Sequence, residues 1–183
     1  MKVKRTVTMK VDNFEIGDQI TVKLREYGKF TATAHEITGK GTLFIFDDCV
    51  CVWPMNECGY LKSDLRKFVT QDLLKAFPNK LLARMVKDDN GDLISIPTYG
   101  QIFGKDWNDE WDQENIEIDQ REQLPLMEKR KNRIADLNGE RCWYWLQNKI
   151  RSLSSFAYVG YIGSAYCSDA SSSSGVRPAF LIR

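Results

Sequence analysis

The last 34 residues of the chain, residues 150–183, contain no Lys, Glu, Gln, Met or Trp. These five types supply 42 of the 183 residues, so about eight of them are expected in this stretch if composition were uniform. Ser, Tyr, Gly and Ala stand in their place, interleaved with apolar residues. The apolar run at residues 176–182 is typical of a β strand. We therefore expect the serines to lie in loops held on a scaffold and not in a flexible tail.

The first stretch, residues 1–53, is predicted to be β. Residues 3–11 and 20–24 alternate between apolar and polar side chains, the period-2 pattern of half-buried strands. Residues 30–34 follow a turn at Tyr27-Gly28-Lys29, which predicts a hairpin. Residues 43–53 form an apolar run interrupted only by Asp47-Asp48, which indicates a buried strand that turns at the acids.

The middle stretch, residues 54–142, is predicted to be helical and then irregular. Ser63 or Asp64 is suited to cap a helix that ends at Pro78 and has an apolar face of Leu65, Phe68, Val69, Leu73 and Phe77. Thr98 is suited to cap a short helix running to Phe103. Acids predominate in residues 106–122, and a basic run follows at 129–133. We expect a solvated excursion in which these charges partly pair.

Whole-chain properties exclude several classes of protein. A chain of 183 residues suits one domain, and a net charge of +1 provides no field for nucleic acid or an anionic membrane. No apolar run is long enough for membrane insertion. Basic residues near the N-terminus precede no apolar segment, so we expect no signal peptide and a cytoplasmic or virion-associated protein.

The cysteines and the single histidine suggest neither a disulfide framework nor a metal centre. The five cysteines are an odd number, and zinc sites usually pair two CxxC-like hooks or add further histidines to the one available here, His35. We expect free thiols and neither metal nor cofactor.

Three segments carry a resemblance to a known family: Tyr144-Trp145-Leu146, residues 156–159 and, above all, Ser-Gly-Val-Arg-Pro-Ala-Phe at 174–180. They resemble a domain family of gut Firmicutes and their phages that is related to the formylglycine-generating-enzyme branch of C-type lectin folds. With weaker internal similarities, the match covers about two thirds of the chain.

The resemblance implies an α+β, C-type-lectin-like fold of the formylglycine-generating-enzyme type in one domain. Residues 1–53 would form an N-terminal β region, residues 54–142 helices and an irregular excursion, and residues 143–183 a lectin-like core. Trp107-Asn108-Asp109 resembles a triplet that vertebrate-type lectins carry beside a calcium ion. In those lectins the triplet lies near the C-terminal strands, whereas here it lies in the middle of the chain, so weak calcium binding stays open.

The same fold branch includes the variable proteins of diversity-generating retroelements, which diversify a C-terminal segment to create binding surfaces. Their adenine-directed mutagenesis never produces Lys, Glu, Gln, Met or Trp at the altered codons, and the depletion after residue 150 matches that restriction. A small-residue loop over a β core shows a similar bias, so an undiversified relative stays open.

A Tyr/Ser-rich segment has the chemistry of a binding surface, because tyrosine offers a rigid ring and a hydroxyl while serine adapts its hydrogen bonds. The residues predicted to face a protein or glycan ligand are Tyr158, Tyr161, Tyr166, Ser168, Asp169, Ser171 and Ser172. At least one of the tyrosines is expected in the core. Arg177, within an apolar segment, is expected to pair with a carboxylate or carbonyl.

We predict that the chain is not an enzyme. Formylglycine-generating enzymes use a cysteine pair, of which Cys167 matches one member while Ile162 stands where the other would be. A phage or prophage structural protein, self-association and a divergent enzyme remain as alternatives.

Overall fold

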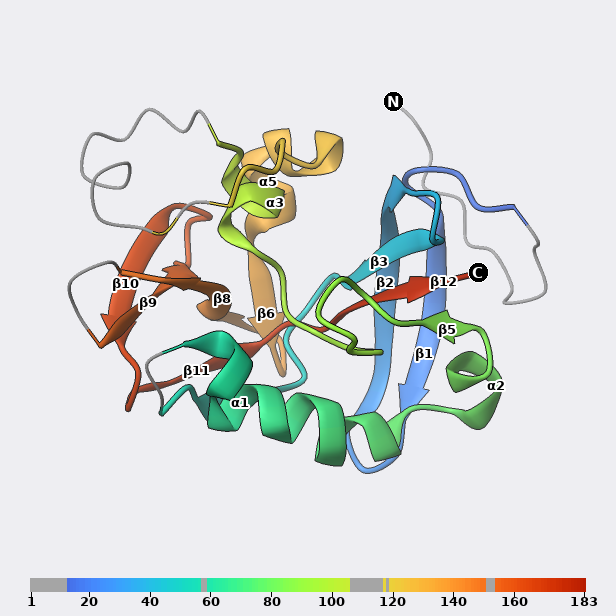
Figure 1. Ribbon diagram of the computed structural model, residues 1–183, viewed down its shortest axis with the longest axis horizontal. Coiled ribbons are helices and arrows are strands. Elements are labelled where there is room, and N and C mark those ends of the chain that lie inside the picture. Colours follow the sequence, from blue (N-terminus) through green and yellow to red (C-terminus); the bar gives the residue numbers. More distant parts are fainter. Residues whose placement is uncertain (1–12, 57–58, 106–116, 118, 151–153) are drawn as a thin grey trace.

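The structure, a computed structural model, describes residues 13–56, 59–105, 117, 119–150 and 154–183. It is a mixed α+β fold dominated by two five-stranded sheets, with short helices around them (Figure 1). The first sheet has the strand order β1-β2-β3-β12-β5 and the second has the order β10-β9-β8-β11-β4. A small ladder pairs β6 with β7.

The first sheet starts from the predicted hairpin. β1 (Gln19–Leu24) pairs antiparallel with β2 (Gly28–Ile37), and β2 pairs antiparallel with β3 (Thr42–Phe46). β12 (Ala179–Ile182) then lies between β3 and the two-residue β5 (Met85–Val86). The strand predicted at residues 3–11 lies outside the described residues.

The turn predicted at Asp47-Asp48 is confirmed, and the segments before and after it are two strands, one in each sheet. β3 ends at Phe46, and β4 (Cys51–Pro54) pairs with β11 (Ser173–Val176) at the edge of the second sheet. Asp47 fixes the point of divergence, because its carboxylate accepts hydrogen bonds from Gln19 at 2.8 Å and Thr33 at 2.5 Å. The chain also passes directly from one sheet to the other between β11 and β12, and it returns to the first sheet at β5 and to the second at β8 through the helical segments.

The second sheet contains the segment depleted in five residue types. β8 (Tyr144–Lys149), β9 (Ser155–Val159) and β10 (Ala165–Asp169) form an antiparallel meander, and β11 lies parallel to β8. The prediction of serine loops is correct only in part. Strands contain Ser155, Ser168, Ser173 and Ser174, and Ser155 and Ser174 are buried.

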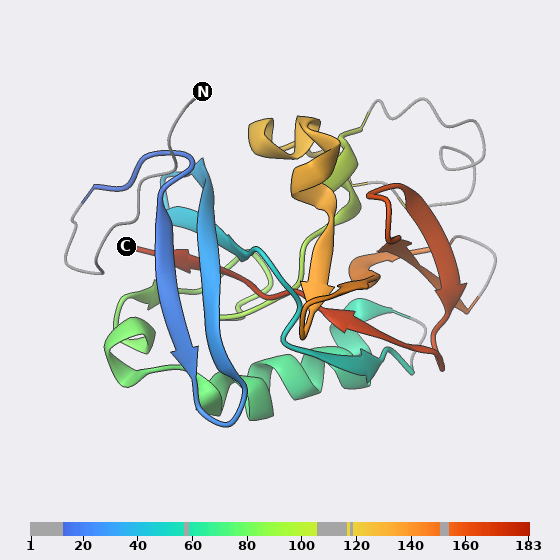
Figure 2. The same ribbon diagram turned by 180° about the vertical axis from the view of Figure 1, so that it is seen from behind.

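The predicted amphipathic helix is confirmed and runs beneath both sheets (Figures 1 and 2). It comprises α1 (Asp64–Lys67), a π-helical turn η2 (Phe68–Asp72) and a 3-10 turn η3 (Leu73–Ala76). The Ser63 hydroxyl caps it by accepting the Arg66 N–H at 3.0 Å. The five apolar residues of the predicted face are all buried. Flanking it are η1 (Tyr60–Lys62) and α2 (Asn79–Leu82).

A second helical layer covers the opposite side of the second sheet. It contains α3 (Tyr99–Phe103), η4 (Pro125–Glu128) and α5 (Arg130–Arg133), followed by the hairpin of β6 (Ala135–Leu137) and β7 (Glu140–Cys142). These elements and β8 enclose a second apolar cluster that includes Tyr99, Phe103, Met127, Tyr144 and Leu146.

The cap predicted at Thr98 is confirmed, and it has a partner that the sequence did not indicate. The Thr98 hydroxyl donates to Asp119 at 2.6 Å and accepts the Gln101 N–H at 3.2 Å. Asp119 also accepts the Gly100 N–H at 2.7 Å. Asp119 is thus half-buried at the helix end, whereas the predicted partial pairing of charges is seen between Lys105 and Glu122. Residues 106–116 lie outside the described residues.

Arg177 joins the two sheets from within. It is 2% exposed, and its guanidinium donates to the Phe46 carbonyl at 2.6 Å, the Tyr144 hydroxyl at 2.8 Å and the Asn132 carbonyl at 3.2 Å. The predicted structural role with carbonyl partners is confirmed.

Candidate ligand-binding face

The pairing of β10, β9 and β8 places three aromatic residues in one row. Tyr166 lies opposite Tyr158, and Tyr158 lies opposite Trp145. Directly opposed residues in a sheet point to the same side. Accordingly, the Tyr158 and Tyr166 rings stack with centroids 5.7 Å apart, and the Trp145 ring meets Tyr158 edge-on at 6.4 Å.

Trp143, just before β8, extends this row toward the surface. Its ring centroid lies 5.0 Å from that of Tyr158 and 5.5 Å from that of Tyr161. Trp143 is 39% exposed, Tyr161 49% and Tyr166 43%, whereas Tyr158 is only 9% exposed. We call Trp143, Tyr158, Tyr161 and Tyr166 the aromatic face.

Tyr158 supports the aromatic face from below and is not itself an exposed contact residue. Burial is the main cause of its raised pKa. Its ring is surrounded by those of Trp143, Trp145 and Tyr166. The prediction that Tyr158 faces a ligand therefore requires correction. The expectation that at least one of the three tyrosines belongs to the core is confirmed.

Backbone contacts hold the exposed rings in place. The Trp143 carbonyl accepts the Gly175 N–H at 2.8 Å and the Ser174 hydroxyl at 3.1 Å. The Tyr166 ring lies over Gly160, where an added Cβ would be 2.7 Å from two of its carbons. Because only glycine leaves room for the ring, this position couples β9 to the orientation of Tyr166.

The polar residues predicted for the site surround the β10–β11 turn. Ser168 is on the same side of β10 as Tyr166, and its hydroxyl donates to that of Ser172 at 3.2 Å. Asp169 alternates to the other side and accepts the Ser155 hydroxyl at 3.1 Å. Ser171 is exposed in the turn itself. Thus Ser168 and Ser172 adjoin the aromatic face, while Asp169 links β10 to β9 through its hydrogen bond with Ser155.

Two tryptophans near this face were not predicted from the sequence. Trp143 lies outside the depleted segment, and only its two-residue spacing from Trp145, which puts both side chains on one side of a strand, could have placed it beside the tyrosines. Trp53 on β4 lies opposite Ser174, stacks on Phe68 at 4.1 Å and is partly exposed. It lies at the far edge of the same sheet.

The comparisons found no matching family model, curated protein or solved structure. Within the part of the chain that the structure describes, no helix is long and apolar enough to span a membrane. The same described residues contain no group of three or more His, Cys, Asp or Glu side chains arranged to hold a metal ion.

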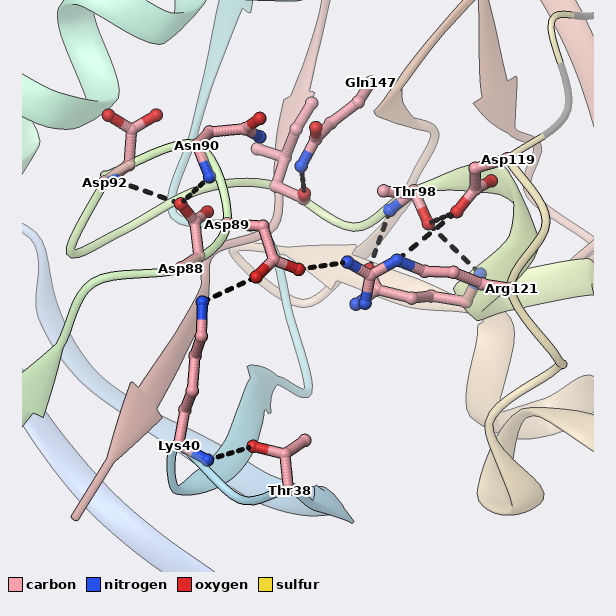
Figure 3. Close-up of polar contacts among 12 residues, drawn as sticks. Thr38, Lys40, Asp88, Asp89, Asn90, Asp92, Thr98, Asp119, Arg121 and Gln147 are labelled. Atoms are coloured by element: carbon pink, nitrogen blue, oxygen red, sulfur yellow. Dashed lines mark hydrogen bonds and ion pairs between the residues drawn. The ribbon is translucent and has the colours of Figure 1, made fainter.

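A cleft of about 300 Å³ lies over the first sheet, near the segment that caps α3. Figure 3 shows its polar rim, where the Asp89 carboxylate lies between Lys40 at 2.6 Å and Arg121 at 3.1 Å. The hydrogen bond from Lys40 is the main reason that the Asp89 pKa is lowered. These exposed charges are paired with one another, which makes the cleft a weaker candidate than the aromatic face.

A larger cleft, of about 600 Å³, lies between the first sheet and α5. Its lining includes His35, Asp47, Lys129 and Arg177. Asp47 and Arg177 already form hydrogen bonds within the fold, Asp47 with the side chains of β1 and β2 and Arg177 with the Phe46 carbonyl. The strongest polar groups of this cleft are thus committed to the fold, and we regard the aromatic face as the candidate site.

Proposed function

We propose that the chain is a non-catalytic ligand-binding module that presents the aromatic face and its neighbouring serines on a C-type-lectin-like scaffold. The observation that carries the proposal is the group of exposed rings of Trp143, Tyr161 and Tyr166 on one side of the second sheet. Exposed aromatic clusters mark interaction sites, and tyrosine and tryptophan contribute strongly to binding energy.

The arrangement of the sheets supports the scaffold part of the proposal. The early strands β1–β3 share a sheet with the last strand β12, and the preceding strand β11 belongs to the sheet that presents the aromatic face. The terminal Val-Arg-Pro-Ala segment thus anchors the presenting sheet through Arg177. A rigid core beneath adaptable surface residues is the organisation of protein and glycan binders.

Burial also supports the retroelement hypothesis. Within the depleted segment, Tyr161, Tyr166, Ser171 and Ser172 are exposed, whereas the strand β9 is buried along its whole length. If the segment is diversified, substitutions in the encoding gene among individuals should concentrate at the exposed positions and spare β9. An invariant segment would remove the retroelement part of the proposal and leave a fixed binder.

Binding is tested with the triple variant Trp143→Ala/Tyr161→Ala/Tyr166→Ala on a glycan array and on a peptide-display library. The matched control is Ile16→Ala/Ile37→Ala/Leu61→Ala, which removes three exposed apolar side chains away from the aromatic face. We expect the wild type and the control to select the same ligands and the aromatic variant to lose them at least tenfold. No selection by wild type, or equal loss in the control, would contradict the proposal.

The same rings also favour a second candidate, a phage or prophage assembly protein in which the aromatic face contacts another subunit. Sedimentation of wild type and aromatic variant distinguishes the two, since only an assembly surface makes the wild type associate with itself. An enzyme of the formylglycine-generating type receives less support, because Cys167 is in β10 while exposed Ile162 occupies the position of its partner.

A further inference from the structure

Two cysteines that are distant in sequence meet where the chain passes between the sheets. Cys49 lies between β3 and β4, and Cys142 is the last residue of β7. They are 1% and 7% exposed, and the Cys142 thiol donates to the Trp143 carbonyl at 3.2 Å. Both are free thiols in the structure.

Gly175 shows how closely the two sulfur atoms approach the same point. A Cβ added at Gly175 would lie 2.6 Å from the Cys49 Sγ and 2.8 Å from the Cys142 Sγ. Distances under 3 Å are not tolerated by real Cβ atoms, so β11 can pass the thiols only with glycine here. The two sulfurs therefore occupy one small pocket behind β11.

Backbone hydrogen bonds hold both cysteines in this arrangement. The Cys49 N–H donates to the Asp136 carbonyl at 2.9 Å, and the Asp136 N–H donates to the Asp48 carboxylate at 3.0 Å. Asp136 is paired with Arg141, the neighbour of Cys142, across the β6–β7 ladder. The segment of Cys49 is thus tied to the hairpin that ends at Cys142.

We propose that Cys49 and Cys142 form an oxidisable dithiol, which a peroxide converts into an intramolecular disulfide between the β3–β4 connection and β7. This modification site is separate from the aromatic face and does not depend on its function.

The environment assigns different roles to the two thiols. The neighbouring Cys49 thiol is the main cause of the lowered pKa of Cys142, whereas the Cys142 thiol and burial raise the pKa of Cys49. Since the thiolate is the nucleophile, Cys142 is the thiol that attacks peroxide and Cys49 the one that resolves. Burial raises the pKa of the nearby Cys51 to about 12, which makes it a poor competitor.

The reaction balances with one peroxide molecule. The Cys142 sulfur bonds to one peroxide oxygen, the O–O bond breaks, and the leaving hydroxide takes a proton to become water. The Cys49 sulfur then attacks the sulfenic sulfur, the S–O bond breaks, and the second water leaves with the thiol proton. Two thiols are oxidised by two electrons and hydrogen peroxide is reduced to two waters.

The test treats the native full chain with hydrogen peroxide, blocks remaining thiols with N-ethylmaleimide and maps the peptides without reduction. We expect a linked pair of peptides containing Cys49 and Cys142, lighter than their sum by two hydrogens. The thermal midpoint should rise by about 5–10 °C, because the crosslink closes a long loop of the unfolded chain. Dithiothreitol should reverse both changes.

Single variants identify the residues involved. Cys49→Ser and Cys142→Ser should abolish the crosslink and the thermal shift, whereas Cys51→Ser and Cys167→Ser should retain both. The wild-type map decides the matter even if a variant fails to fold. A native protein whose Cys49 and Cys142 stay alkylatable while other thiols oxidise, or whose crosslink joins other cysteines, would overturn the proposal.

Discussion

At the scale of single residues, the three tyrosines first grouped by composition divide by burial. Tyr158 is enclosed by Trp143, Trp145 and Tyr166, while Tyr166 has one face toward solvent. We expect Tyr158→Ala to lower the free energy of unfolding by about 3 kcal/mol, because it leaves a cavity among packed rings. Tyr166→Ala should cost about 1 kcal/mol or less, since this side chain is already 43% exposed in the folded protein.

Urea unfolding followed by circular dichroism measures both free energies. Similar losses for the two variants would mean that the Tyr166 ring is as much a part of the core as Tyr158, and the aromatic face would then be smaller than proposed.

Arg177 is a second case in which one side chain supports a large part of the fold. Replacement by leucine leaves the carbonyls of Phe46 and Asn132 and the Tyr144 hydroxyl without their buried donor. The Tyr144 hydroxyl keeps its hydrogen bond to the Arg133 carbonyl, whereas each of the two carbonyls left unsatisfied costs about 1–3 kcal/mol, so we expect Arg177→Leu to lose at least about 2 kcal/mol. The exposed Arg141→Leu is the control, with an expected change within about 0.5 kcal/mol. A small effect of Arg177→Leu in urea unfolding would show that water replaces the guanidinium.

At the scale of elements, α3 depends on a cap from distant sequence. An added Cβ at Gly100 would lie 2.7 Å from the Asp119 carboxylate, which accepts the Gly100 N–H. Alanine normally stabilises a helix relative to glycine by about 1 kcal/mol. We nevertheless expect Gly100→Ala to destabilise the protein by about 1–2 kcal/mol, because the Asp119 contacts must shift. The thermal midpoint of the variant measures this.

The control for Gly100 is Gly39→Ala, since an added Cβ there meets no atom within 4 Å. This variant should have an unchanged midpoint within about 2 °C. If Gly100→Ala were more stable than wild type, the carboxylate of Asp119 would not be fixed at the helix terminus.

The elements also show which features of the fold a sequence reveals. The hairpin of β1 and β2, the helix capped by Ser63 and the short helix capped by Thr98 were predicted because periodicity and caps are local signals. The turn between β3 and β4 was predicted at Asp47-Asp48, but their places in two different sheets were not, because these depend on pairing with β12 and β11 more than a hundred residues later. Composition likewise could not distinguish Asp119 from the exposed acids Glu117 and Glu122.

At the scale of the whole molecule, the two sheets, joined through Arg177, form a packed scaffold that carries a small exposed surface, the aromatic face. The aromatic face could be predicted in part, because the unusual composition of residues 150–183 marks its tyrosines and serines. Composition could not show that Tyr158 is buried and Tyr166 exposed, nor that Trp143 belongs to this face, since only the strand register brings these rings together.

The separation into scaffold and surface predicts how the segment tolerates change. In a library that randomises one codon at a time, we expect Tyr161, Tyr166, Ser171 and Ser172 to accept most residues, because these side chains are exposed. The strand β9 is buried at every position, so most substitutions there should leave little folded protein. Sorting the library for protease resistance measures both classes in one experiment. If the exposed positions proved as intolerant as β9, their side chains would be needed for folding, and the segment could not serve as a surface that varies on a constant core.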